Sequence, residues 1–242
     1  MTLLESLKNK FQIRFKNRDI AAKILAGALE DYLKKLKIDK NNDTILILGI
    51  PRGGVIVGDI VASKLPYYCD FDIVIPRKLT APNNHEIAIG AIMEDGNAFL
   101  NDDIITDLEV DREYLEKEKT RQLEEIKRRT ISYRGLKKPI KLQDQIVILV
   151  DDGAATGATI IAAARWIKRQ GPKKVIMALP VTSKDTVELL KQECDHVVTG
   201  TTPSSVIFKT VGQYYQEFCQ VEDNQVIQVI RKWEVQKVRN EK

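Results

Sequence analysis

Four short runs of apolar, largely β-branched residues recur along the chain, and helical spacing fills much of the sequence between them. The runs cover residues 44–48, 71–75, 145–150 and 174–181. Near-continuous apolar runs of this length are typical of parallel strands that are covered on both faces. Because strands and helices alternate, the pattern predicts an open sheet with right-handed crossovers. The predicted fold class is α/β, with a mostly parallel sheet and helices on both faces.

Helices are predicted before the first run and after the first, third and fourth runs. Residues 18–36 carry apolar side chains at helical spacing, which predicts an amphipathic helix that packs on the sheet. The later helices are predicted over 55–65, 158–169 and 184–192, and Ser183 is placed to serve as the N-cap of the last one.

A long insertion separates the second run from the third. Its first part, residues 88–100, has two short apolar runs around Asp95 and Gly96, and Asp-Gly is typical of hairpin turns. Its second part, 108–132, is predicted to be a highly charged helix whose outer face either meets solvent or binds a partner. We therefore predict a helical insertion at 101–140.

Composition narrows the class of protein. Apolar residues make up 43% of the 242 residues, which excludes a disordered chain. No apolar run approaches the ~18 residues of a membrane-spanning helix, and charges interrupt the leucines near the start of the sequence. We therefore expect no membrane partner and a cytoplasmic location.

The net charge of +4 is small and dispersed, which argues against a nucleic-acid partner. Three widely spaced cysteines predict free thiols.

The most informative segment is a buried run at 146–150 followed by a turn of small residues that leads into a helix. Glycines permit tight backbone conformations in such a turn, and alanines leave its main-chain N–H groups accessible. These amides and the positive end of the next helix dipole form a cup that suits a phosphate group. The residues expected to bind substrate here are Gly153, Ala154, Ala155, Thr156, Gly157 and Thr159, with the threonines adding hydroxyl donors.

Two adjacent carboxylates, Asp151 and Asp152, stand between the run and the turn and are called the acid pair below. Carboxylates repel a phosphate, so their most economical use is to accept hydrogen bonds from neutral hydroxyl groups beside it. Neighbouring side chains on an extended backbone diverge, which suits two adjacent hydroxyls of a ribose 5-phosphate. The alternative is an ordinary Asp turn before a Thr-capped helix. A phosphoacceptor receiver domain is disfavoured, because the Thr-Gly turn would have no use there.

The segment 146–159 resembles the ribose-phosphate signature of type I phosphoribosyltransferases, in which two acids follow a strand and precede a small-residue Thr-Gly loop. Five further motifs resemble an uncharacterised branch of the same family, so that the resemblance covers most of the chain. They lie at 15–19, 49–54, 76–78, 86–91 and 211–218. The resemblance implies a single domain over residues 1–242, with a small hood to which the C-terminal segment 200–242 contributes.

The resemblance implies phosphoribosyl pyrophosphate as a substrate, with its pyrophosphate held by the loop 49–54. There Gly53 and Gly54 open the backbone and Arg52 offers a charged fork to phosphate oxygens. In the family this loop often contains a non-proline cis peptide, which would lie within 51–53 here. Arg77 would add positive charge for the substrate. Catalytic roles fall to Asp151, Asp152, Arg52 and Lys78.

The implied reaction displaces pyrophosphate at the anomeric carbon by a nitrogen acceptor such as a nucleobase, as part of nucleoside metabolism. Mg²⁺ is the implied cofactor, and Asp151 and Asp152 would hold it directly or through ribose hydroxyls and water. Residues 79–87 would form a loop that closes over the site. A homodimer is an assembly that the resemblance allows.

The acceptor is not fixed by the sequence. Ala155 stands where hypoxanthine and guanine phosphoribosyltransferases carry an acid, which argues against 6-oxopurines. Tyr214, Tyr215 and Phe218 are spaced to line one face of a helix, where they would either stack on a base or form core. A second function stays open: a regulatory protein that binds phosphoribosyl pyrophosphate or a nucleotide without catalysis. The absence of an acid at Ala155 and the charged helix at 108–132 favour it.

Overall fold

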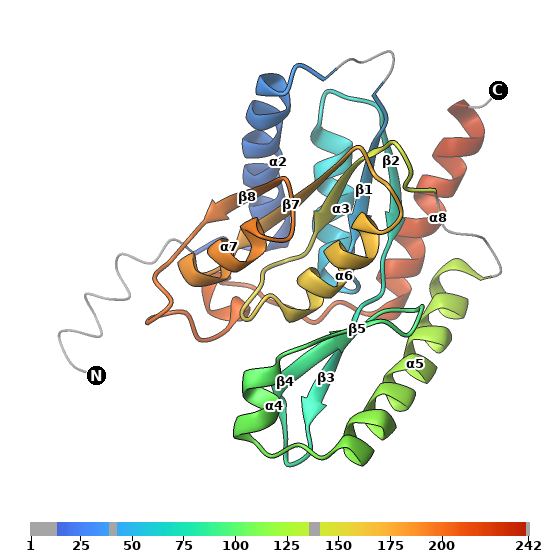
Figure 1. Cartoon of the computed structure of the whole chain (residues 1–242). Coiled ribbons are helices and arrows are strands. Elements are labelled where there is room, and N and C mark those ends of the chain that lie inside the picture. The colour runs from blue at the N-terminus through green and yellow to red at the C-terminus, as the bar shows by residue number, and fades with distance from the viewer. Residues whose placement is uncertain (1–13, 39–42, 136–140, 241–242) are drawn as a thin grey trace.

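A five-stranded parallel sheet forms the centre of the protein, in the strand order β2-β1-β6-β7-β8 (Figure 1). The computed structural model describes residues 14–38, 43–135 and 141–240. The strands are β1 (Ile45–Gly49), β2 (Cys69–Ile73), β6 (Ile146–Val150), β7 (Lys174–Val181) and β8 (His196–Thr201). The four strands predicted from the apolar runs are therefore confirmed, and the fold class is α/β as expected.

Helices cover both faces of this sheet, because successive residues of each strand point to opposite sides. Ile45 and Ile47 of β1 belong to the core on the side of α2 and α3, whereas Leu46 and Leu48 belong to the core on the side of α6. The helices are α2 (Arg18–Lys35), α3 (Gly53–Lys64), α6 (Ala158–Lys168) and α7 (Lys184–Lys191). The predicted Ser183 cap is confirmed, since its side chain accepts a hydrogen bond from the amide of Thr186.

The insertion forms a second layer beside the carboxyl ends of the main strands (Figure 1). It contains a three-stranded antiparallel sheet in the order β3-β4-β5 and two helices. Its elements are β3 (Arg77–Ala81), β4 (Asn84–Ile92), β5 (Ala98–Leu100), α4 (Asp102–Asp107) and α5 (Arg112–Arg134). The hairpin predicted around Asp95 and Gly96 is confirmed as β4 and β5. Residues 136–140 of the expected insertion lie outside the described residues.

Residues 79–87, predicted as a loop that closes over the site, form strands and a tight turn, and their closing role stays a prediction. These residues belong to β3 and β4, which form a hairpin with Pro82 and Asn83 in its turn. Leu79 and Ala81 are buried, so the segment packs as a sheet. Thr80 is held by two residues of α5, because its hydroxyl donates to the Glu118 carboxylate at 3.2 Å and its carbonyl accepts from the hydroxyl of Tyr114. These contacts attach the β3 end of the hairpin to α5, whereas residues 82–84 at its turn are exposed.

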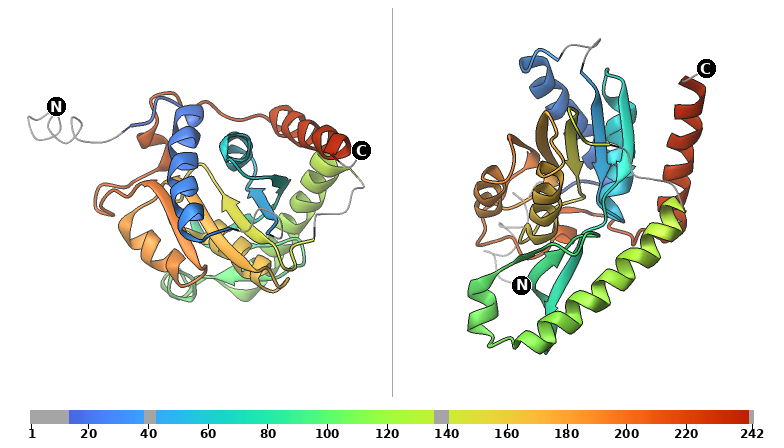
Figure 2. Two further views of the ribbon diagram at one scale, coloured as in Figure 1. Left: turned by 90° about the horizontal axis from the view of Figure 1, so that it is seen from above. Right: turned by 45° about the vertical axis from the view of Figure 1, so that its right-hand side comes forward.

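The C-terminal segment wraps around the sheet edge after β8. It comprises the hood segment, residues 202–222, which contains the short 3₁₀ helix η1 (Val211–Tyr214), and then α8 (Asp223–Asn240). Figure 2 shows α5 meeting the start of α8, and the two helices contact each other. None of the helices among the described residues is long and apolar enough to cross a membrane.

Gly27 gives a first test of the fold. It lies on the exposed face of α2, and a Cβ built there meets no atom within 4 Å. Glycine in a helix interior costs about 0.5 to 1 kcal/mol relative to alanine. We therefore expect Gly27→Ala to raise the free energy of unfolding by about that amount, measured by urea denaturation. A lower stability would mean that this face of α2 is covered.

Candidate active site

The acid pair lies at the point where the sheet changes direction. From β1 the chain crosses through α3 on one face to β2, and from β6 it crosses through α6 on the other face to β7. Gly49 at the end of β1 is paired with Val150 at the end of β6, so the loops that follow these strands leave side by side. Open α/β sheets bind ligands at such a switch point. The structure thus brings together the acid pair and the loop 49–54, as expected.

The first turn of α3 is pressed against the acid pair, and only glycine fits there. A Cβ on Gly53 would overlap the carboxylate of Asp152. A Cβ on Gly54 would lie 2.5 Å from the carbonyl oxygen of Val150 and 2.8 Å from the Cα of Asp151. The two glycines therefore permit a close approach of two backbones, which sequence reasoning had assigned to backbone freedom alone.

Arg18, the first residue of α2, is a site residue that the sequence did not single out as one. Its Nε donates to Oδ2 of Asp152 at 2.8 Å, and its Nη2 lies at the same distance from that oxygen. Its guanidinium also stacks on Phe218, 3.9 Å from the ring centroid, and donates to the carbonyl of Cys219 at 2.7 Å. Arg18 therefore joins α2, the acid pair and the hood segment.

The position of Arg18 follows from the strand-like contact just before it. The amide of Phe15 donates to the carbonyl of Tyr214 at 2.8 Å, and the amide of Gln216 donates back to Phe15 at 2.9 Å. Asn17 then caps α2 by accepting from the amide of Ile20. A cation in the first turn of a helix opposes the helix dipole, which indicates that Arg18 needs an acidic partner elsewhere.

The carboxyls of the acid pair are electrostatically strained. Burial, followed by the charge of Asp152, raises the pKa of Asp151 well above its usual value. Burial also raises the pKa of Asp152, and Arg18 opposes that rise. The carboxylate of Asp151 accepts a hydrogen bond from the amide of Asp152 at 2.8 Å. Buried carboxyls whose pKa values are raised by burial and by a neighbouring like charge are candidates for a functional site.

The turn after the acid pair is open on one side and anchored on the other. Gly153, with φ of 156°, and Gly157, with φ of 77°, adopt conformations that favour glycine. Ala155 and Thr156 are exposed. No partner for the amides of Ala155, Thr156 and Gly157 is found among the described residues. These three amides are thus available to an anion at the start of α6.

The amide of Ala154 is already used inside the protein, although the sequence placed this residue in the phosphate cup. It is buried, its amide donates to the carbonyl of Val181 at 3.1 Å, and its own carbonyl accepts from the hydroxyl of Thr182. The residue extends the sheet pairing beyond β6, as its bridge to Thr182 shows. Its backbone therefore anchors the turn, and we correct the expectation that its amide belongs to the phosphate cup.

Arg52 lies in the loop 49–54 and faces the start of α8. The peptide bond between Pro51 and Arg52 is cis, within the range where the resemblance had placed one. The Arg52 guanidinium is 3.7 Å from the carboxylate of Asp223, which also accepts from the hydroxyl of Tyr133 at 2.7 Å. Because 3.7 Å is longer than a hydrogen bond, Arg52 is only loosely held by the protein.

Arg77 and Lys78 begin β3, the first strand of the insertion. The Nε of Arg77 donates to the side chain of Gln122 on α5 at 2.8 Å. Burial and the neighbouring Arg129 lower its pKa. Lys78 lines a hollow together with Arg77 and Arg121. Arg77 is thus held by α5, and the binding of substrate by Arg77 and Lys78 stays a prediction.

The aromatic residues of the hood segment do not share a helix face. Tyr214 ends η1 and is buried, while Phe218 is 38% exposed and belongs to no helix. Tyr215 is buried too, and its hydroxyl donates to the backbone carbonyl of Asp152 at 2.6 Å. Tyr215 therefore fixes the acid pair from the hood side, and Phe218, which stacks on Tyr215 with ring centroids 4.8 Å apart, is the most exposed of the three rings.

Replacing Arg18 tests whether it holds the site together. We expect Arg18→Met to lower the free energy of unfolding at neutral pH by about 2 to 4 kcal/mol, because it leaves a largely buried carboxylate without its cation. As the pH falls and Asp152 takes up a proton, the difference from wild type should shrink. Urea denaturation at two pH values measures both effects, and Arg18→Lys, which keeps a charge, should lose less. A loss that is independent of pH would contradict this role.

Comparison with known proteins identifies relatives over most of the chain. The sequence profile of the family described as "Phosphoribosyl transferase domain" matches residues 15–217. Two Mycobacterium tuberculosis proteins, from strains CDC 1551 and H37Rv, bear the provisional name phosphoribosyl transferase. Each is 38% identical over 183 residues, which is 76% of this chain and 40% of the relative. The chain thus spans about two fifths of the length of these relatives. A crystal structure from Thermus thermophilus is similar, with a TM-score of 0.71, 37% identity and coverage of 91% of this chain and 99% of that one.

Proposed function

Because the chain belongs to the phosphoribosyl transferase domain family, we propose that it transfers phosphoribose from phosphoribosyl pyrophosphate to a nitrogen acceptor. The observation that carries the proposal is the meeting of the acid pair with open amides at the switch point of the sheet. Ribose hydroxyls and a 5-phosphate need these two kinds of group side by side. The acceptor would be a nitrogen heterocycle of nucleoside metabolism, and the reaction would take place in the cytoplasm. The assembly of the protein as a homodimer stays a prediction.

The sugar phosphate would lie along the turn that follows β6. The amides of Ala155, Thr156 and Gly157 would bind the 5-phosphate, with the hydroxyls of Thr156 and Thr159 as further donors. The carboxylate of Asp151 would accept hydrogen bonds from ribose hydroxyls, since it has no cation in direct contact among the described residues. Asp152 is paired with Arg18 and would contribute its second oxygen.

The leaving group would lie at the loop 49–54. Arg52 is loosely paired with Asp223 and can turn its fork to a phosphate oxygen. No group of three or more potential metal ligands gathers among the described residues. This fits Mg²⁺, which keeps water and substrate oxygens as ligands and would need only Asp151 or Asp152 here. When bound, the ion neutralises charge that develops on pyrophosphate.

In this reaction the protein mainly positions the reactants. The bond between the anomeric carbon and the pyrophosphate oxygen breaks, the bond to the acceptor nitrogen forms, and the electron pair leaves with pyrophosphate. Positive charge that develops on the ribose is stabilised by the carboxylates of the acid pair, and no covalent nucleophile is needed. Phe218, which is 38% exposed beside Arg18, would contact the acceptor.

A regulatory protein without catalysis is the second candidate function. Two of the charged groups that would hold substrate are already paired inside the protein, Asp152 with Arg18 and Arg52 with Asp223. Such a site can bind a nucleotide and change the contacts of the hood segment and α8 without a reaction. Ala155 also leaves the acceptor without an acid from the turn.

Turnover separates the two functions. Protein, phosphoribosyl pyrophosphate and Mg²⁺ are incubated with a panel of purines, pyrimidines and non-nucleobase amines, and released pyrophosphate is measured. The proposal expects release that depends on one acceptor and stops when Mg²⁺ is chelated. Tight binding of phosphoribosyl pyrophosphate by calorimetry with no release for any acceptor would support the regulatory function instead.

A further inference from the structure

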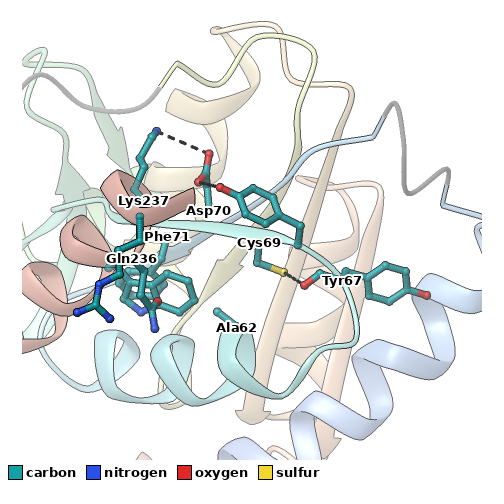
Figure 3. A pocket seen from close by; sticks show the side chains of 10 residues that line it. Ala62, Tyr67, Cys69, Asp70, Phe71, Gln236 and Lys237 are labelled. Carbon is teal, nitrogen blue, oxygen red and sulfur yellow. Dashed lines mark hydrogen bonds and ion pairs between the residues drawn. The ribbon is translucent and has the colours of Figure 1, made fainter. Parts of the chain in front are cut away.

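A second cavity, of about 320 Å³, lies between β2, the end of α3 and α8 (Figure 3). Asp70, on its wall, pairs with Leu46 near the amino end of β1, whereas the acid pair follows the carboxyl end of β6. Val147 of β6 is level with Leu46, and the acid pair begins four residues later, so at about 3.3 Å per residue the two sites are separated by roughly 13 Å along the strands and by the width of two strands across the sheet. The cavity is therefore distinct from the candidate active site.

Aromatic rings form one side of the cavity and are held rigidly. The indole of Trp233 donates from Nε1 to the carboxylate of Asp59 at 2.7 Å and stacks on Phe71, with centroids 5.5 Å apart. Tyr68, also on the wall, is 59% exposed. Fixed and partly exposed aromatic rings bind planar ligands at a low cost in side-chain entropy.

Two cations of α8, the helix that also carries Trp233, line the same cavity. Lys237 faces Asp70 at 3.8 Å, which is longer than a hydrogen bond (Figure 3). Arg239 has no charged or hydrogen-bonded partner among the described residues. Cys69 adds no negative charge, because burial and the nearby Asp70 raise the pKa of its thiol to about 12. The wall thus carries two cations against the single carboxylate of Asp70, an excess that suits an anion.

We propose that this cavity binds a nucleoside monophosphate, with its base against the aromatic residues Trp233 and Tyr68 and its phosphate held by the cations of the wall, Lys237 or Arg239. Gln236, which lies between Trp233 and Lys237 in the sequence of α8, also lines the cavity and offers both a donor and an acceptor to the edge of a base. Asp70 is already approached by the hydroxyl of Tyr68 at 3.4 Å and would accept from a ribose hydroxyl. A volume of about 320 Å³ lies within the range of small-molecule sites. The inference does not depend on catalysis at the acid pair.

Trp233 itself reports on the cavity. The chain has two tryptophans, so Trp166→Phe leaves Trp233 as the only indole fluorophore. In this background we expect AMP, GMP or UMP to quench the fluorescence saturably. The nucleoside without phosphate should bind at least about tenfold more weakly, since the charged hydrogen bonds are lost. Ribose 5-phosphate, which lacks the base, should not quench. The absence of saturable quenching by all three nucleotides at millimolar concentration would overturn the proposal.

Charge variants on α8 supply the matched control. Lys237→Gln with Arg239→Gln should weaken nucleotide binding about tenfold or more. Arg231→Gln also removes a cation from α8, but Arg231 is exposed and does not line the cavity, so binding should change by less than twofold. Equal weakening by both would show a general effect of charge and contradict the site.

A third variant separates this cavity from the active site. In Asp151→Asn with Asp152→Asn, quenching of Trp233 by nucleotides should be unchanged, whatever happens to turnover. If quenching disappears in that variant, the nucleotide binds at the acid pair and the proposed second site is wrong. If turnover is absent but quenching persists, the proposed function fails while this inference stands.

Discussion

Asp151→Asn is expected to make the protein more stable at neutral pH and far less active. The loss of activity follows from the loss of the Asp151 charge, because a hydrogen bond from a ribose hydroxyl to a carboxylate is worth about 1.5 to 3 kcal/mol. Its loss should lower kcat/KM by about 10- to 150-fold in the pyrophosphate-release assay. The Asn oxygen can still accept from the amide of Asp152, so the local backbone should be kept.

The gain in stability follows from the direction of the pKa shift. Burial and the Asp152 charge raise the folded pKa of Asp151 above its ordinary value of 3.8. The folded state therefore binds more protons than the unfolded state, and stability falls as the pH rises from about 4 through the raised value. Asn has no charge to bury. Urea midpoints for wild type and variant should agree at pH 4 and separate at pH 7.5, with the variant higher. A lower midpoint at pH 7.5 would contradict a buried charge at this position.

Asp152→Asn serves as the comparison, because the same chemical change removes a charge that has a partner. The guanidinium of Arg18 lies 2.8 Å from the Asp152 carboxylate, and it would lose that ion pair. Any gain in stability should therefore be smaller than for Asp151→Asn, or absent. A protein in which the two variants behave alike would not have the asymmetry that the contacts of Arg18 create.

The sequence predicts the part of the site that is local along the chain. A buried strand, two acids and a turn of small residues occur within 146–159, and strand, turn and helix form there as expected. The chain cannot reveal contacts between residues that are far apart in sequence. Arg18 and Asp152 are 134 positions apart, and only the unfavourable placement of a cation at a helix start indicates that Arg18 needs a partner.

Strands with mixed composition were missed for a related reason. β8 at the sheet edge has a single buried residue, Val198, and two threonines, so it lacks the apolar run that identifies a central strand. β3 begins with two charged residues, Arg77 and Lys78, and its buried face is covered by the distant α5. Its pairing with β4 gives residues 79–81 a strand structure where the sequence predicted a loop. Tertiary packing, rather than local pattern, decides such segments.

Gly54→Ala is expected to damage both stability and activity, although it adds a single methyl group. The new Cβ would lie 2.5 Å from the carbonyl oxygen of Val150 and 2.8 Å from the Cα of Asp151. Both are backbone atoms, so α3 and β6 must separate. Separation also strains the hydrogen bond from the amide of Ile50 to Val150, now 2.9 Å. Overpacking of this kind costs about 1 to 3 kcal/mol. We expect that loss in urea denaturation.

The activity of Gly54→Ala should fall further than its stability, because the shift moves the loop 49–54 away from the acid pair. A displacement of about 1 Å can cost roughly 100-fold in rate when two groups must act on one substrate. Gly53→Ala differs, since its Cβ would meet the side-chain carboxylate of Asp152 rather than backbone atoms, so it should impair activity with a smaller loss of stability. Gly27→Ala, with open space around it, controls for the loss of glycine. Wild-type turnover in Gly54→Ala would mean that the two loops do not act on the same molecule.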